Sequence, residues 1–156
     1  MTIPTSSSIS HGASHWPVRN PFVRRQRAEQ HDVDAFGHVN NLRYVDWAQE
    51  VAWGHSEMLG MSLDDFVQSG FAFVVQRHEF DYKLPVLDGQ EVLIATWIAE
   101  NDGIVRLNRA YEMRRPDDGA LVFQGITRFV TVELASGRPV RMPAEWPGIF
   151  APAELV

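Results

Sequence analysis

Residues 32–47 read DVDAFGHVNNLRYVDW, and this stretch decides both the expected fold and the expected chemistry of the chain. Two carboxylates, a glycine, a histidine and a pair of asparagines come directly before an amphipathic helix. The N-terminal end of a helix carries unpaired N–H groups and a partial positive charge. Polar side chains beside such an end can stabilise a carbonyl oxygen that becomes negative during a reaction. The stretch therefore indicates acyl-transfer chemistry, with Asp34 as the first candidate for the reacting carboxylate.

The helix expected from this stretch runs from about Asn41 to Met58. Asn40 is the predicted N-cap, because its side-chain oxygen can accept an N–H of the first turn. Gly60 stands where a helix commonly ends. A short second helix is expected over Leu63 to Gln68. The apolar residues of the long helix recur at the spacing of one helical face, at Tyr44, Val45, Ala48, Val51, Ala52, Met58 and Leu59.

The rest of the chain predicts strands. Turn signals with glycine at 88–89, 101–103 and 117–119 separate the last four strands, and they predict an antiparallel meander. The order β-α-β-β-β-β predicts an α+β fold with one long helix against one sheet. Uncovered sheet edges indicate self-association. The expected strands are Phe22 to Glu29, Phe71 to Lys83, Glu91 to Glu100, Val105 to Arg114 and Leu121 to Leu134.

Composition narrows the class of protein. The chain has 156 residues, enough for one domain, and its net charge of −6 argues against a broad nucleic-acid surface. Without cysteine it has no disulfide, no thiolate metal site and no cysteine nucleophile. No apolar run is long enough to cross a membrane, and the N-terminus lacks the features of a secretory signal. We expect a disordered tail over 1–20, a single domain over 21–150 and a cytoplasmic location.

The motif D-V-D-A-F-G-H-V-N-N-L-R-Y, followed by a helix and four long strands, resembles the hotdog-fold acyl-CoA thioesterases of the 4-hydroxybenzoyl-CoA thioesterase type. FDYKLPVLDGQEVLIATWI is similar to the family's strand–Pro–Asp-Gly–strand segment, and TRFVTVELASGRPVRMPAEW to its last strand and Gly-Arg-Pro ending. The resemblance covers about residues 22–147. It implies a hotdog fold, in which an antiparallel sheet wraps the long helix. It also implies a homodimer or homotetramer with active sites at the subunit boundary.

The resemblance implies hydrolysis of an acyl-CoA thioester to a carboxylic acid and free coenzyme A, with no cofactor and no metal. Asp34 matches the family's nucleophile or general base. Asn41 falls where the helix start offers a backbone N–H to the thioester carbonyl. His38 is interpreted first as orienting the loop and second as assisting catalysis. Phe36 stands where related plant acyl-carrier-protein thioesterases have an Asn, which argues against an Asn-assisted mechanism.

Other residues complete the expected site. Asp32 is interpreted as holding the loop by hydrogen bonds, and His55 as an interior histidine. The acyl slot is expected between the helix and the partner subunit. A non-catalytic module that binds acyl-CoA or acyl-carrier protein is the alternative function. The candidate substrate-binding residues are Gly37 and Asn40 in the loop, the aromatic residues Tyr44, Phe71 and Phe73, and Arg138 and Arg141 for the coenzyme A phosphates.

Overall fold

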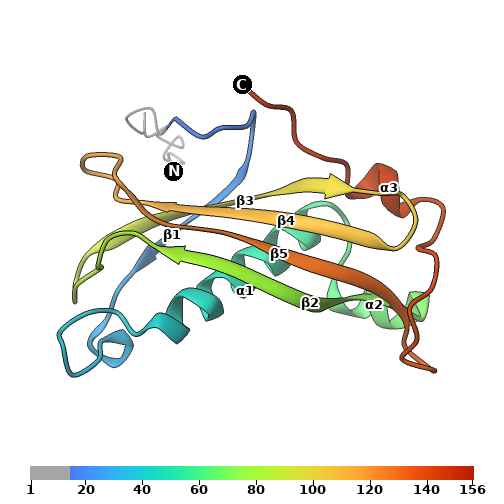
Figure 1. Cartoon of the computed structure of the whole chain (residues 1–156), viewed down its shortest axis with the longest axis horizontal. Helices are drawn as coiled ribbons and strands as arrows, with labels where there is room; N and C mark the ends of the chain where they lie inside the picture. Colours follow the sequence, from blue (N-terminus) through green and yellow to red (C-terminus); the bar gives the residue numbers. More distant parts are fainter. Residues whose placement is uncertain (1–14) are drawn as a thin grey trace, which may run out of the picture.

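The computed structural model describes residues 15–156 (Figure 1). Residues 1–14 of the predicted tail lie outside the described residues. Residues 15–20 are described, and Val18 among them is 3% exposed and pairs with Leu155 in an isolated bridge. Trp16 and Val18 pack with Ala95 and Trp97 of the sheet. The packed part of the chain therefore begins before residue 21.

Five antiparallel strands form one sheet in the order β1-β3-β4-β5-β2. The long helix α1 lies against one face of this sheet, as Figure 1 shows. No helix within residues 15–156 combines the length and hydrophobicity that a membrane crossing requires. The strands are β1 (Phe22–Arg27), β2 (Phe71–Tyr82), β3 (Glu91–Asn101), β4 (Arg106–Arg114) and β5 (Leu121–Glu133); the helices are η1 (Gln30–Asp32), α1 (Asn41–Met58), α2 (Leu63–Ser69) and α3 (Trp146–Ile149).

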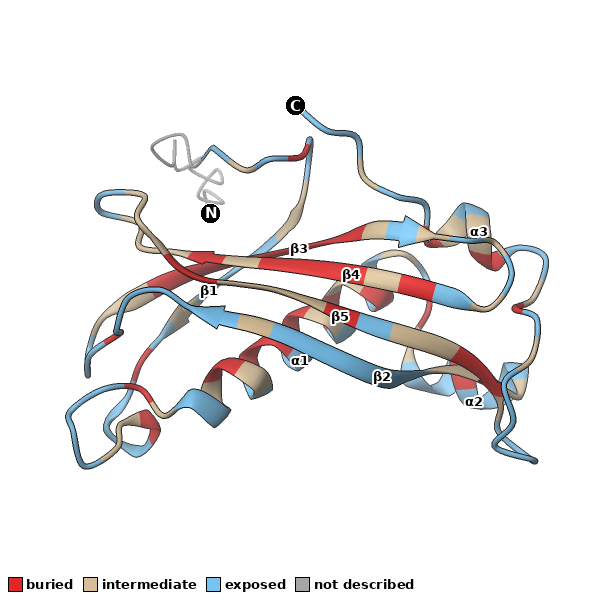
Figure 2. Ribbon diagram, viewed as in Figure 1, coloured by how far each residue is buried: buried red, intermediate tan, exposed pale blue. Residues whose placement is uncertain are grey.

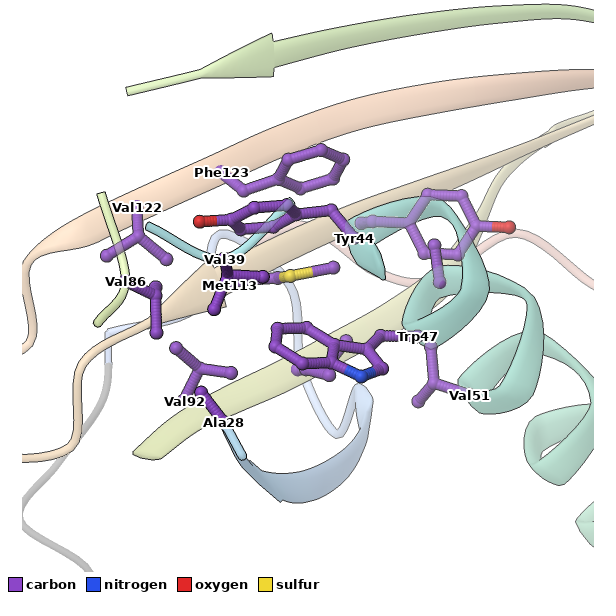
Figure 3. Close-up of a cluster of buried hydrophobic side chains, with 13 residues drawn as sticks. Ala28, Val39, Tyr44, Trp47, Val51, Val86, Val92, Met113, Val122 and Phe123 are labelled. Carbon is purple, nitrogen blue, oxygen red and sulfur yellow. The ribbon is translucent and has the colours of Figure 1, made fainter. Parts of the chain in front are cut away.

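The long helix begins and ends where the sequence predicts. Asn40 caps it, since its side-chain oxygen accepts the Leu42 N–H at 3.0 Å. Gly60 follows the helix with φ of +89°, a left-handed conformation that glycine adopts without strain. Figure 3 shows the core between α1 and the sheet, where the Tyr44 ring lies nearly parallel to the Phe123 ring. The centroids of the two rings are 5.5 Å apart. The buried stripe of α1 thus faces the sheet.

The predicted meander is confirmed for β3, β4 and β5 and is wrong for β2. β2 pairs with β5 at the sheet edge, so the turn at Asp88 and Gly89 joins strands that are not neighbours. The connecting segment is held instead by the loop before α1. The Val39 N–H donates to the Val86 carbonyl at 2.8 Å, and the Gly89 N–H donates to the Ala28 carbonyl at 2.9 Å. The Asp88-Gly89 turn therefore belongs to a connection between two strands that do not pair, and not to a hairpin.

β2 is an edge strand with most of its length in solvent. Residues 74–79 are exposed, and Figure 2 shows the strand pale blue over most of its length. A bulge interrupts its pairing with β5 between Val75 and Arg77. Within residues 15–156 no strand pairs with the other side of β2. The strand therefore presents free backbone N–H and C=O groups to the surroundings.

Candidate active site

The loop before α1 holds the carboxylate of Asp34 in a fixed position. Its Oδ1 accepts the Phe36 N–H at 2.9 Å and the His38 N–H at 3.4 Å. The Asp34 N–H donates to the His38 carbonyl at 2.8 Å, and Gly37 turns the chain between them with φ of +78°. Among residues 15–156 no donor occupies Oδ2. The half-buried carboxylate is thus anchored by one oxygen and has the other available for a reaction.

The start of α1 presents a free amide beside this loop. Asn40 satisfies the Leu42 N–H, and the Asn41 N–H takes part in no hydrogen bond of the described residues. The Tyr82 hydroxyl of β2 donates to the Asn41 carbonyl at 3.0 Å. An unpaired N–H at the positive end of an 18-residue helix can bind a developing oxyanion.

Asp32 has the structural role that the sequence predicts. It is 3% exposed, and its Oδ2 accepts the Glu29 N–H at 2.9 Å. Its Oδ1 lies 3.3 Å from Nε of Arg43 in α1 and 3.3 Å from Nε2 of His31. The two aspartates of the motif therefore differ in environment, since Asp32 is buried and joins the loop to the helix, whereas Asp34 is half-buried and contacts only its own loop.

A cavity of about 350 Å³ lies elsewhere, between α1, α2 and the inner face of the sheet. Trp53 of α1, Phe66 of α2, Phe73 of β2 and Phe129 of β5 give it a mostly apolar wall. It is of the size that small-molecule sites have. Its polar wall residues are Gln49, Ser56, His78, Arg109 and Tyr111.

Arg109 of β4 is the only buried arginine of residues 15–156, at 3% exposed. Its Nη1 donates to Nδ1 of His55 at 2.7 Å and to Oγ1 of Thr96 at 3.3 Å. Burial and the neighbouring guanidinium lower the pKa of His55 to about 4, so the imidazole is neutral at pH 7 and accepts this hydrogen bond. His55 is thus the interior histidine that the sequence predicts.

The structure does not bring the predicted site residues together in one region. Asp34, Gly37, His38, Asn40 and Asn41 come together at the start of α1, outside the cavity wall. Phe73 lines the cavity, whereas Phe71 packs partly buried in the neighbouring aromatic cluster.

The remaining predicted residues lie apart from both regions. Tyr44 is 3% exposed and belongs to the core under the sheet instead of to the cavity wall, because its ring stacks on Phe123. Arg138 and Arg141 are exposed in the segment after β5. The assignment of roles to these residues stays a prediction. No group of three or more His, Asp or Glu within residues 15–156 could hold a metal ion.

Sequence reasoning missed the polar wall of the cavity. Arg109 is not among the substrate-binding residues expected from the sequence. The alternation along β4 could have revealed it, because every second residue of a strand lies on the same face of the sheet. The residues of this face are Leu107, Arg109, Tyr111 and Met113, and all four are buried. An arginine on the apolar face of a strand is unusual and could have been singled out. Ser56 and Gln49 gave no comparable signal.

A family model described as the thioesterase-like superfamily matches residues 28–149 of this chain. No curated protein sequence matches it. Among solved structures, a 1,4-dihydroxy-2-naphthoyl-CoA thioesterase from Synechocystis is similar with a TM-score of 0.75 at 19% identity, covering 84% of this chain and 96% of that chain.

Two structures from Staphylococcus aureus are also similar. A DHNA-CoA thioesterase has a TM-score of 0.74 at 20% identity, covering 83% of this chain and 87% of that one. A protein solved in complex with CoA has a TM-score of 0.78 at 15% identity, covering 88% of this chain and 85% of that one. At these identities the three structures establish a shared fold.

Proposed function

The chain belongs to the thioesterase-like superfamily and has its hotdog fold, and from this premise we propose that it hydrolyses an acyl-CoA thioester to a carboxylic acid and free coenzyme A. The observation that carries the proposal is the loop before α1, which holds the anchored carboxylate of Asp34 and ends at the free Asn41 N–H. A structure of the same fold was solved with CoA, which supports a ligand of this type.

In the proposed mechanism the thioester carbonyl oxygen accepts the Asn41 N–H. As the carbonyl is attacked, negative charge grows on this oxygen, and the amide and the helix dipole stabilise it by roughly 3 kcal/mol. Two routes use Asp34. Either its carboxylate attacks the carbonyl carbon and expels the coenzyme A thiolate, leaving an anhydride for water to cleave, or it takes a proton from the water that attacks.

The loop residues have supporting roles in this proposal. The backbone N–H of His38 donates to Oδ1 of Asp34 at 3.4 Å, and the proposal keeps the orientation of the loop as the first role of His38. Gly37 gives the loop its left-handed turn, and Asn40 keeps the helix start in place. Arg138 and Arg141 are proposed to contact coenzyme A phosphates, because both are exposed and neither forms an ion pair within residues 15–156.

We also propose that two copies pair along β2. The free edge supports this, and so does the apolar surface next to it, since Val75 and Trp53 at the cavity are 45% and 44% exposed. Backbone pairing of two β2 strands would join the sheets and cover this surface. Light scattering of the purified protein tests the pairing, and a monomer at micromolar concentration would contradict it.

The test of the activity offers purified protein a panel of acyl-CoAs, with a thiol-detecting dye to report free coenzyme A. Hydrolysis should depend on Asp34 and should be lost in Asp34→Asn. Asp64→Asn is the matched control, because it removes an exposed carboxylate on α2 away from the loop. Activity that Asp34→Asn retains would contradict the mechanism. Acyl-CoA that stays bound and intact would favour the non-catalytic binding module.

A further inference from the structure

The guanidinium of Arg109 is buried among neutral partners. Besides His55 and Thr96, it reaches Ser56 of α1, whose Oγ lies 3.5 Å from Nη2. These three partners use three of the five N–H donors that a guanidinium carries. The charge therefore has hydrogen bonds but no anion among these partners.

No carboxylate of the described residues compensates this charge. None of the ion pairs within residues 15–156 involves Arg109. By contrast, the more exposed Arg25, Arg77 and Arg114 each pair with a glutamate. A buried charge without a counter-charge is costly. The unusual feature is thus a cation that the fold buries and leaves unpaired.

The same cation lines the cavity. Arg109, Ser56 and Tyr111 form one polar patch of a wall that is otherwise largely aromatic and aliphatic. A wholly apolar ligand would leave the guanidinium without an anion. A ligand with a hydrophobic body and one negative group would satisfy both parts of the wall. Carboxylate fits best, because the planar fork of arginine matches it with two parallel hydrogen bonds.

Arg109 lies far along α1 from the loop in which we propose that the thioester reacts. Its partner Ser56 lies 15 residues after Asn41, which is about 22 Å along the axis of α1. The thioester at the helix start and an anion at Arg109 are therefore held at opposite ends of the acyl group.

We infer that Arg109 is a specificity-determining residue for acyl groups that carry a second carboxylate at the end away from the thioester. The inference rests on the proposed thioesterase activity for the site of reaction, and on the cavity for the site of recognition. The substrate class is then the CoA monothioester of a hydrophobic dicarboxylic acid. In the complex, the second carboxylate replaces the missing counter-charge of Arg109, and the apolar wall covers the chain.

The kinetic test compares pairs of CoA thioesters that differ only in the terminal carboxylate, at tetradecanoyl, hexadecanoyl and octadecanoyl length, because shorter chains cannot span the distance from the helix start to Arg109. For at least one length, kcat/KM should be at least about tenfold higher for the carboxylated member. Arg109→Met should remove this preference, so that the two members of each pair have the same kcat/KM. Arg109→Lys keeps the positive charge and should therefore retain part of the preference for the carboxylated thioester. Equal rates within every pair for the unaltered enzyme would overturn the inference.

A binding test on the same protein needs no thioester. Decanoate and decanol share a chain and differ in the head group, and tryptophan fluorescence can report binding because Trp53 lines the cavity. Decanoate should bind about tenfold more tightly than decanol, and Arg109→Met should bind both equally. A preference for decanoate that survives in Arg109→Met would overturn the inference. If the protein prefers decanoate through Arg109 but hydrolyses no acyl-CoA, only the thioesterase proposal is refuted. If it hydrolyses acyl-CoA but has no preference for a carboxylate, only the anion site is refuted.

Discussion

The loop around Asp34 and the cavity around Arg109 are built in opposite ways. Five residues of the loop and helix start lie within positions 34–41, whereas the cavity wall draws on positions 49–134. The loop is exposed and held by its own backbone amides, while the cavity needs α1, α2 and three strands in register. The groups that we propose for the reaction can therefore be read from consecutive residues, whereas the cavity, where we propose that the acyl group binds, depends on long-range packing.

The largest expected effect separates the two aspartates of the loop. Asp34→Asn should lower kcat by about 10³-fold, because general-base or nucleophilic action is lost. Its melting temperature should stay unchanged, since the side chain is half exposed. Asp32→Asn should lower the melting temperature and leave kcat nearly unchanged, because it weakens buried contacts with Glu29 and Arg43. Steady-state kinetics and thermal unfolding on both variants measure this, and equal losses of activity would break the distinction.

The next effect is a dependence of folding stability on pH, which comes from His55 beside Arg109. His55 has a pKa of about 4 in the folded protein and near 6.5 when unfolded, so the unfolded chain binds the proton first as the pH falls. Stability should be complete above pH 6.5 and should decline toward pH 4, by about 3 kcal/mol at most. Urea unfolding between pH 7 and pH 4.5 measures it. His55→Gln, which cannot titrate, should show a flatter profile, and an identical profile would contradict the assignment.

A smaller effect is expected from the aromatic wall. Phe73 packs against Trp146 at 4.8 Å and Phe150 at 5.1 Å between ring centroids and also lines the cavity. Phe73→Leu should cost about 1–2 kcal/mol of unfolding free energy. It should also shift the preferred acyl group toward a bulkier one. Phe71→Leu is the control, because Phe71 packs nearby outside the wall. The same shift in both variants would show that the cavity does not select the acyl group.

The smallest effect tests the helix start. Asn40→Ala removes the acceptor for the Leu42 N–H and should cost about 1 kcal/mol of stability. Asn40→Ser keeps a capping oxygen and should restore stability. If Asn40 also contacts substrate, as predicted, then KM should remain raised in Asn40→Ser. Chemical denaturation and KM measured together separate the two roles, and full recovery of both would assign Asn40 to capping alone.

The same contrast explains which predictions succeeded. The bounds of α1, the Asn40 cap and the position of each strand follow from periodicity and turn residues, and the family match confirms the predicted thioesterase class and the hotdog fold. The pairing partner of β2 could not be predicted from turn residues, because an Asp-Gly turn has the same sequence whether it joins paired strands or strands that are not neighbours. The cavity was missed because its wall residues meet only after β2 pairs with β5.

The free edge of β2 would link concentration to activity if two copies pair along it, as we propose. If two copies pair along this strand, mass action makes the assembled form depend on the amount of protein present. Specific activity should then fall on dilution below the dissociation constant and recover when the sample is concentrated. A lone subunit would carry an open template for adding further strands, so loss of the pair would favour precipitation. Under this proposal, activity assays would have to be compared at matched protein concentrations.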